Sequence, residues 1–147
     1  MPLISPAARR FLKAARVAHM ATVDESGAPT VLPICFQVKG RYLYSVIDEK
    51  PKRAAPMALR RVRDLLAQPR LAVVVDHYEE DWRRLGWVLL RGEAELLTPG
   101  NAHGEALALL RAKYPQYREM NLAQRPIIRM RILSLRSWGD LTPRGAE

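Results

Sequence analysis

The sequence holds one cysteine, Cys35, among its 147 residues, so no disulfide can form within the chain. Its sequence neighbours are apolar, and no cation or histidine lies beside it, which favours a buried structural thiol over a nucleophile. No apolar run approaches the roughly 18 residues that a membrane-spanning helix requires. The first ten residues lack the apolar core and cleavage site of a secretory signal. We therefore expect a cytoplasmic protein with no membrane partner.

The common sequence motifs of catalytic and metal sites are absent as well. His19, His77 and His103 are the only histidines, and none has a second ligand at zinc-site spacing. There is no Walker loop, dinucleotide fingerprint or nucleophile elbow. The acidic stretch 76–81 is best explained as a solvated loop, because consecutive loop residues seldom converge on one metal ion. We expect no metal site and no catalytic side chain, which leaves a binding protein or an enzyme whose cofactor performs the chemistry.

Positive charge is in excess. The chain has 24 Lys and Arg against 15 Asp and Glu, a net charge of +9, and its cations cluster at 9–16, 50–63 and 125–136. Such a balance favours an anionic partner. Nucleic acid, a phosphorylated cofactor and an acidic small molecule all satisfy it.

Helix and strand patterns fill the first half of the chain. Ser5 and Pro6 suit the start of an amphipathic helix over 7–16. Turn signals at Ser26-Gly27 and Lys39-Gly40 separate three strands within 17–48. A helical spacing of apolar residues then runs over 54–68.

The second half predicts four further elements: a strand buried on both faces at 71–75, an alternating strand at 87–97, a helix at 99–114 and a last strand at 127–138. In the last strand the alternation shifts between Ile132 and Leu133, which indicates a β-bulge. No βαβ rhythm is present. The order predicts an α+β protein with one domain, residues 1–147, built as a six-stranded antiparallel β-barrel with flanking helices.

The third strand leads into the sequence D-E-K-P-K-R, which delivers several cations to one spot: Lys50, Lys52 and Arg53. Ammonium and guanidinium groups bind phosphate through charge-assisted hydrogen bonds. This strand end is therefore a candidate anion site. A solvated charged loop explains the same residues equally well.

Several motifs follow one another in a fixed order: A-R-V-A-H-M-A-T-V-D, G-A-P-T-V-L-P-I-C-F, D-E-K-P-K-R, L-R-R-V-R-D-L-L-A-Q-P-R-L-A-V-V-V-D-H-Y-E-E-D-W and W-V-L-L-R-G-E-A. This order resembles the pyridoxamine-5'-phosphate-oxidase-like (PNPOx-like) split β-barrel superfamily. It is most similar to the subgroup of deazaflavin (coenzyme F420)-dependent oxidoreductases. The resemblance extends from about Phe11 to Trp138.

The resemblance implies a homodimer with two cofactor sites between its protomers. It implies hydride transfer between coenzyme F420 and an electron-poor organic small-molecule substrate, with an FMN-binding oxidoreductase as the alternative. The residues it assigns to the cofactor are Thr22, Pro33, Ile34 and Trp87 at the ring, Lys50, Lys52 and Arg53 with Arg60 or Arg61 at the phosphate, and Trp138 at the partner's site.

An alternative of a different class is a non-catalytic basic module that binds nucleic acid through Arg60, Arg61 and Arg63. Two observations disfavour it. The cations are spread over three segments, and no known reader motif is present.

Overall fold

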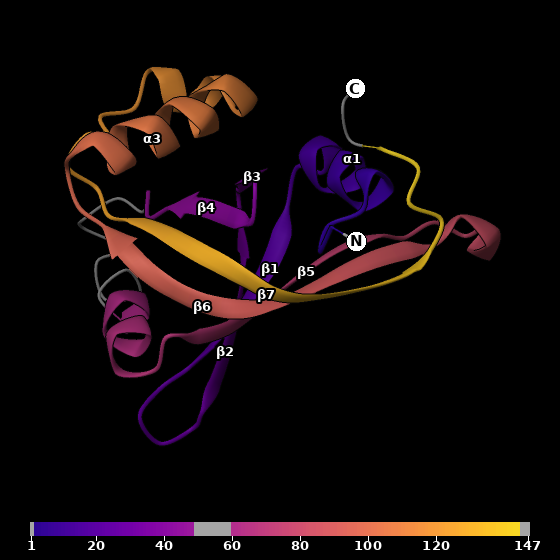
Figure 1. Ribbon diagram of the computed structural model, residues 1–147, viewed down its shortest axis with the longest axis horizontal. Helices are drawn as coiled ribbons and strands as arrows, with labels where there is room; N and C mark the ends of the chain where they lie inside the picture. The colour runs from indigo at the N-terminus through magenta and orange to yellow at the C-terminus, as the bar shows by residue number, and fades with distance from the viewer. Residues whose placement is uncertain (1, 49–59, 145–147) are drawn as a thin grey trace.

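A computed structural model of the chain describes residues 2–48 and 60–144, and within them seven strands form one curled antiparallel sheet (Figure 1). The strand order is β2-β1-β5-β6-β7-β4-β3. The α+β class and the antiparallel barrel-like sheet are confirmed, with seven strands instead of six. The strands are β1 (Ala18–Val23), β2 (Pro29–Ile34), β3 (Gln37–Lys39), β4 (Tyr42–Val46), β5 (Arg70–His77), β6 (Gly86–Leu97) and β7 (Ile127–Gly139).

The additional strand arises because the second predicted strand is broken at Cys35 and Phe36. β2 pairs with β1, whereas β3 pairs with β4, and these two pairs lie at opposite ends of the sheet. The Tyr114 hydroxyl accepts a hydrogen bond from Phe36 N–H at 3.0 Å and also lies 3.0 Å from the Phe36 carbonyl oxygen. The break is thus the point where the chain crosses between the sheet edges, and a buried tyrosine satisfies its backbone.

Two helices begin and end close to their predicted bounds, and the helix predicted over 54–68 ends as predicted, while its predicted start lies outside the described residues. Ser5 caps α1 (Pro6–Ala14), and its hydroxyl accepts from Ala8 N–H at 3.1 Å. Such a cap contributes about 1 kcal/mol. Residues 60–67 are helical, and α3 covers Asn101–Lys113. Two 3₁₀ turns follow β5 and α3, namely η1 (Trp82–Arg84) and η2 (Pro115–Arg118). Among the described helices, none is long and apolar enough to cross a membrane.

The long strands β6 and β7 form a ribbon along the curve of the sheet (Figure 1). Their register shifts opposite Gly92, so that Ser134 pairs with Arg91 and Ile132 with Gly92, which leaves Leu133 as the bulged residue. This confirms the predicted bulge. A side chain at Gly92 would collide with the Arg131 carbonyl oxygen, so the close approach of the strands requires glycine there.

The core lies between the concave side of the sheet and the helices. Phe11 and Leu12 of α1 pack into one cluster with sheet residues such as Val73 and Leu90, and α3 covers a second cluster. One prediction about the core is wrong in this single chain. β5 buries Leu71, Val73 and Val75 on its inner side, but its outer face stays half-exposed because no described element covers that side.

Candidate functional site

A cavity of about 190 Å³ opens beside the end of β2, the end of β4 and the helix at 60–67. Its wall combines apolar and polar side chains, with the apolar share larger, so it can accept a ligand with both kinds of surface. Its lining consists of Val17, Pro33, Ile34, Cys35, Ser45, Val46, Asp48, Arg61 and Tyr117.

The polar wall is built around Asp48, which directly follows β4. The Tyr117 hydroxyl donates to Asp48 Oδ2 at 2.7 Å. Burial raises the pKa of the Tyr117 hydroxyl well above its usual range, and the hydrogen bond to Asp48 raises it further. Tyr117 therefore stays protonated, donates its O–H hydrogen bond to Asp48, and offers the cavity its accepting lone pairs.

The cation of this wall is Arg61, which is 5% exposed. Burial lowers the pKa of its guanidinium, and the nearby Asp48 charge acts in the opposite direction. A positive and a negative side chain thus face the same small space. Because each offsets the other, the cavity itself carries little net charge.

The apolar wall comes from the β2–β3 crossing. Pro33 and Ile34 end β2, and Cys35 follows them with its carbonyl oxygen accepting from Ser45 Oγ at 2.8 Å. Cys35 is partly buried, less so than the sequence predicts, because it lies at the cavity wall instead of within the core.

Lys113 lies behind this wall and was not singled out from the sequence. Lys113 is 9% exposed. Its Nζ donates to the Leu12 carbonyl oxygen at 3.3 Å and lies 4.0 Å from the centre of the Phe36 ring. Burial, with a smaller contribution from the Arg16 charge, lowers the pKa of Lys113 to about 7. The available signal was its spacing, since it continues the buried side of α3 three residues after Leu110.

Of the predicted cofactor residues, the structure brings Pro33, Ile34 and Arg61 together at this cavity. Lys50, Lys52 and Arg53 lie outside the described residues. Asp48, the last described residue before them, lines the cavity. No local pattern marks Tyr117 as a site residue, since it comes from η2, far along the chain.

Thr22 and Arg60 lie elsewhere. Thr22 is 3% exposed on the inner side of β1. Arg60 is exposed and lines a separate hollow of about 640 Å³ between the β1–β2 turn and the helix at 60–67, together with Arg63 and Asp24. Arg60 and Arg61 line different hollows because consecutive helix positions point about 100° from each other.

Trp87 and Trp138 are cross-strand partners on β6 and β7 of the same chain. Trp138 is 54% exposed. Trp87 lines an open, mostly apolar hollow of about 610 Å³ on the outer side of the sheet, which also includes His19, Val31 and Leu89. Within one chain these indoles therefore lie beside each other, apart from the cavity at Arg61.

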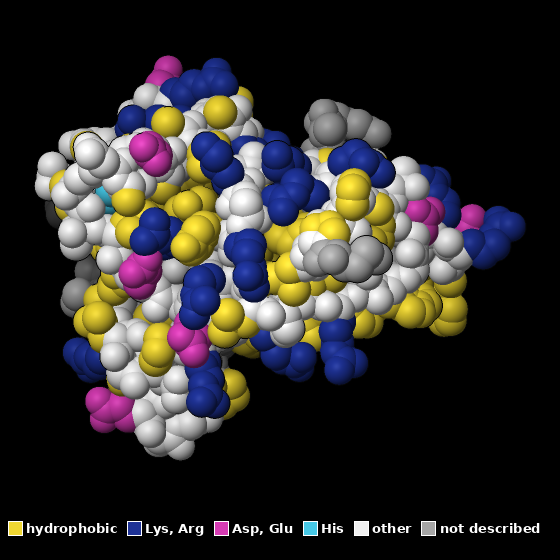
Figure 2. All heavy atoms as spheres, viewed as in Figure 1, with side chains coloured by type: hydrophobic (Ala, Val, Ile, Leu, Met, Phe, Trp, Pro, Cys, Tyr) yellow, Lys and Arg dark blue, Asp and Glu magenta, His cyan; other side chains and the backbone are white. Residues whose placement is uncertain are grey.

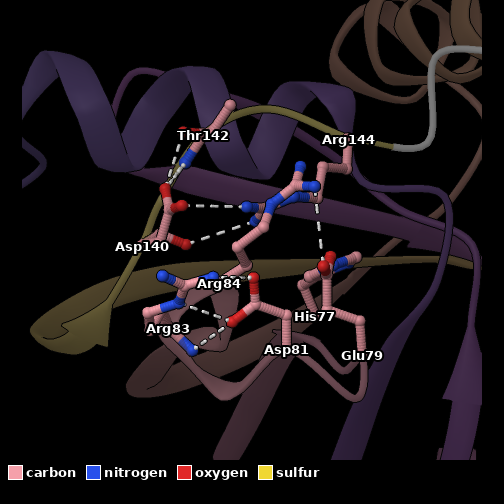
Figure 3. A network of polar contacts seen from close by, with 8 residues as sticks. All are labelled: His77, Glu79, Asp81, Arg83, Arg84, Asp140, Thr142 and Arg144. Atoms are coloured by element: carbon pink, nitrogen blue, oxygen red, sulfur yellow. Dashed lines mark hydrogen bonds and ion pairs between the residues drawn. The ribbon is translucent and has the colours of Figure 1, made fainter.

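The acidic loop after β5 is held by its own ion pairs (Figure 3). His77 Nε2 lies 2.5 Å from Glu79 Oε2, and Arg84 reaches the same carboxylate at 3.5 Å. The segment after β7 joins this loop, because Asp140 N–H donates to the Leu85 carbonyl oxygen at 2.8 Å. Within residues 2–48 and 60–144, no group of three or more His, Cys, Asp or Glu could hold a metal ion.

A curled antiparallel sheet whose two edges are joined by the short β2–β3 crossing defines the split β-barrel class. Residues 4–139 match the family model described as pyridoxamine 5'-phosphate oxidase, and the chain belongs to this family. A comparison with curated proteins finds no match.

Solved structures share the fold at low sequence identity. The heme storage protein HutZ from Vibrio cholerae aligns with a TM-score of 0.69 and 15% identity over 92% of this chain and 94% of its own. A FAD-binding protein from Mesorhizobium loti gives 0.67 and 21% over 90% and 93%. An F420 reductase gives 0.60 and 22% over 86% and 93%.

Proposed function

We propose that the protein is an oxidoreductase that transfers a hydride between coenzyme F420 and an electron-poor organic substrate. The observation that carries the proposal is the meeting of Pro33, Ile34 and Arg61 at one cavity, which adjoins the chain leading to Lys50, Lys52 and Arg53. The family includes oxidoreductases, and an F420 reductase shares the fold. FMN is the alternative cofactor for the same site, since a FAD-binding protein shares the fold too.

The residues present fit such a cofactor. Pro33, Ile34 and Val46 offer an apolar wall against which an aromatic ring can pack, while Arg61 supplies a cation on the side where the phosphate would lie. When bound, the deazaflavin supplies the hydride. The chain's own residues bind and orient the ring and exclude water from it. Tyr117 offers a hydrogen-bond acceptor to the ligand, because its proton is held by Asp48.

The size of the cavity supports a dimer as the active form. About 190 Å³ is less than the roughly 300–1,000 Å³ of a typical ligand pocket, so the described residues of one chain enclose only part of the ligand. The half-exposed outer sides of β5 and β6 and the exposed Val31 offer an apolar surface to a second copy. We therefore propose a homodimer whose second protomer completes each site.

Heme binding is a second candidate, and one observation favours it. His19 is exposed and lines the apolar hollow with Val31, Val74 and Leu89. A neutral imidazole is a common ligand of heme iron, and apolar side chains suit the porphyrin. The heme storage protein HutZ shares the fold.

Titration of the purified protein with coenzyme F420, FMN and hemin, followed by tryptophan fluorescence and absorbance, separates these candidates. We expect saturable quenching by F420. Pro33→Glu should weaken it at least tenfold by placing a charge on the apolar wall, while Pro29→Glu on the same strand serves as the matched control, since both prolines are exposed. Saturable hemin binding lost in His19→Ala, without binding of F420 or FMN, would contradict the proposal.

A further inference from the structure

Positive charge gathers in stretches of the chain that contain no acid. Residues 1–23, 28–47 and 127–139 contain no Asp or Glu and hold nine Lys and Arg. Residues 50–63 are also free of Asp and Glu and hold six more Lys and Arg. Cations without neighbouring acids are therefore concentrated in particular segments of the chain.

The fold brings cations of the first two stretches onto one surface. Arg9 of α1 donates from Nη2 to the Gly40 carbonyl oxygen at 3.0 Å, which joins the helix to the β3–β4 turn. In that turn Arg41 donates from Nη2 to the Ile132 carbonyl oxygen of β7 at 3.3 Å. We call this surface the basic face; its members are Arg9, Arg10, Lys13, Lys39 and Arg41. Figure 2 shows many Lys and Arg side chains across the middle of one view of the molecule, with hydrophobic and a few acidic side chains among them.

The basic face is not neutralised within the part of the chain that the structure describes. None of its five members forms an ion pair with a described carboxylate, whereas Arg83, Arg84, Arg129 and Arg144 all do. Arg9 is half-buried and the other four are exposed. Neighbouring cations without acids repel one another, so a surface of this kind is stabilised when an anionic partner covers it.

We propose that the basic face binds the phosphodiester backbone of nucleic acid without reading its sequence. Arginine and lysine are the side chains that contact phosphates, and arginine can do so with two hydrogen bonds. Stacking on bases is not available, because the strongly exposed aromatics among the described residues are Tyr78, Trp82 and Trp138, outside this face. The spread of cations along the sequence does not count against this partner, because the fold gathers them.

A membrane surface fits less well. A helix that lies in a bilayer interface inserts its apolar side, but Ala8, Phe11 and Leu12 of α1 are buried in the core of the protein. The side of α1 that remains outside carries Arg10 and Lys13. The exposed side of α1 therefore presents cations but no apolar side chains that could insert into a membrane.

Binding through this face should depend steeply on salt. Each phosphate contact contributes about −0.9 to the slope of log K against log salt on duplex DNA and about −0.7 on single strands, so four or five contacts predict a slope of about −3 to −4.5. Raising salt from about 50 to about 200 mM should then weaken binding roughly 60- to 500-fold.

Fluorescence anisotropy of the full chain with a labelled DNA duplex and a labelled single-stranded RNA tests the proposal in two arms. The variant Arg10→Gln, Lys13→Gln, Lys39→Gln should bind at least tenfold more weakly at low salt and have a slope smaller by about 2 to 3. The control Arg70→Gln, Arg83→Gln, Arg91→Gln removes three exposed cations elsewhere and should bind as the parent does.

Three results would overturn the proposal. The first is no binding of either nucleic acid at about 50 mM salt, where such contacts are strong. The second is equal weakening in both variants, since binding would then follow net charge and not this face. The third is tighter binding to phosphatidylserine vesicles than to nucleic acid, lost in the first variant, which would assign the face to a membrane. None of these results bears on cofactor titration, which uses a different part of the molecule.

Discussion

At the scale of single residues, Asp48 and Arg61 decide how much positive charge the cavity offers to a ligand. Asp48 accepts from Tyr117 and lies close enough to Arg61 to influence its ionisation. A phosphate at this position would compete with Asp48 for the guanidinium. Our proposal therefore assigns most of the attraction for an anionic group to the cations that follow in the sequence, Lys50, Lys52 and Arg53.

The first prediction concerns Lys52. If it contacts a cofactor phosphate, Lys52→Ala removes a charge-assisted hydrogen bond worth about 1.5–3 kcal/mol, and cofactor affinity falls roughly tenfold to a hundredfold. Thermal stability of the free protein should hardly change, because the contact exists only with ligand bound. Raising salt should weaken binding of the parent more than that of the variant. Unchanged affinity for both F420 and FMN in the variant would exclude Lys52 from the site.

The second prediction concerns Lys113, whose pKa falls from 10.5 to about 7 on folding. Between these pH values the unfolded chain binds more protons at Lys113 than the folded chain does. The free energy of unfolding therefore increases as pH rises from 7 toward 10.5. Below pH 7 the cost of burying the ammonium is fully present; each pKa unit corresponds to about 1.4 kcal/mol.

Lys113→Met should therefore stabilise the protein most below pH 7, with the advantage over the parent shrinking toward pH 10. Denaturant unfolding across this range measures it. Lys13→Met, at an exposed position on α1, is the matched control and should leave the pH dependence as it is. A pH-independent difference between Lys113→Met and the parent would show that the ammonium is not held in a desolvated state.

At the scale of elements, the β2–β3 crossing depends on Tyr114. Besides Phe36, its hydroxyl lies 3.0 Å from the Arg16 carbonyl oxygen, so one side chain joins the end of α3 to the crossing and to the segment after α1. The guanidinium of Arg16 also lies over the Tyr114 ring, at 4.7 Å from its centre. The cavity wall at Cys35 is therefore positioned by α3.

Tyr114→Phe should destabilise the protein by about 1–3 kcal/mol, because the Phe36 backbone groups are buried and lose their partner. Tyr78→Phe removes a hydroxyl from a 61% exposed side chain and should change stability by less than about 0.5 kcal/mol. Urea unfolding of the two variants is the measurement. Similar stabilities would mean that the crossing is held without Tyr114.

The sequence predicts those elements whose signal is local. The Ser5 cap, the faces of β6 and the bulge at Leu133 all follow from spacing within one segment, and the structure confirms them. The break at Cys35 and Phe36 depends on which distant strands pair, and no local pattern marks it. The same holds for the candidate site, where the inward direction of Arg61 and the contribution of Tyr117 result from tertiary packing.

At the scale of the whole molecule, the apolar outer face of the sheet predicts a homodimer. Val31 is 60% exposed, and the hollow beside it is lined by Val74, Trp87 and Leu89. An interface here should bury more than about 1,000 Å². Sedimentation at micromolar concentration should then show a species of twice 16.7 kDa.

Val31→Glu should shift the protein toward monomer, because the dimer would bury an unpaired carboxylate. Leu66→Glu is the control, since Leu66 is 72% exposed and lies on the helix at 60–67, away from this hollow. If the parent sediments only as a 16.7 kDa species, the dimer proposal fails. A second protomer then cannot complete the cavity at Arg61.

The joining of the two sheet edges also affects how the chain is made. β3 and β4 form a hairpin early in synthesis, but the next neighbour of β4 is β7, with Tyr42 opposite Arg131 and Val46 opposite Ile127. Until β7 leaves the ribosome, one side of β4 has no partner to receive its hydrogen bonds. Pairings between segments so distant in the chain form slowly, and unpaired strand edges invite aggregation meanwhile. The nascent sheet is therefore most vulnerable just before β7 emerges.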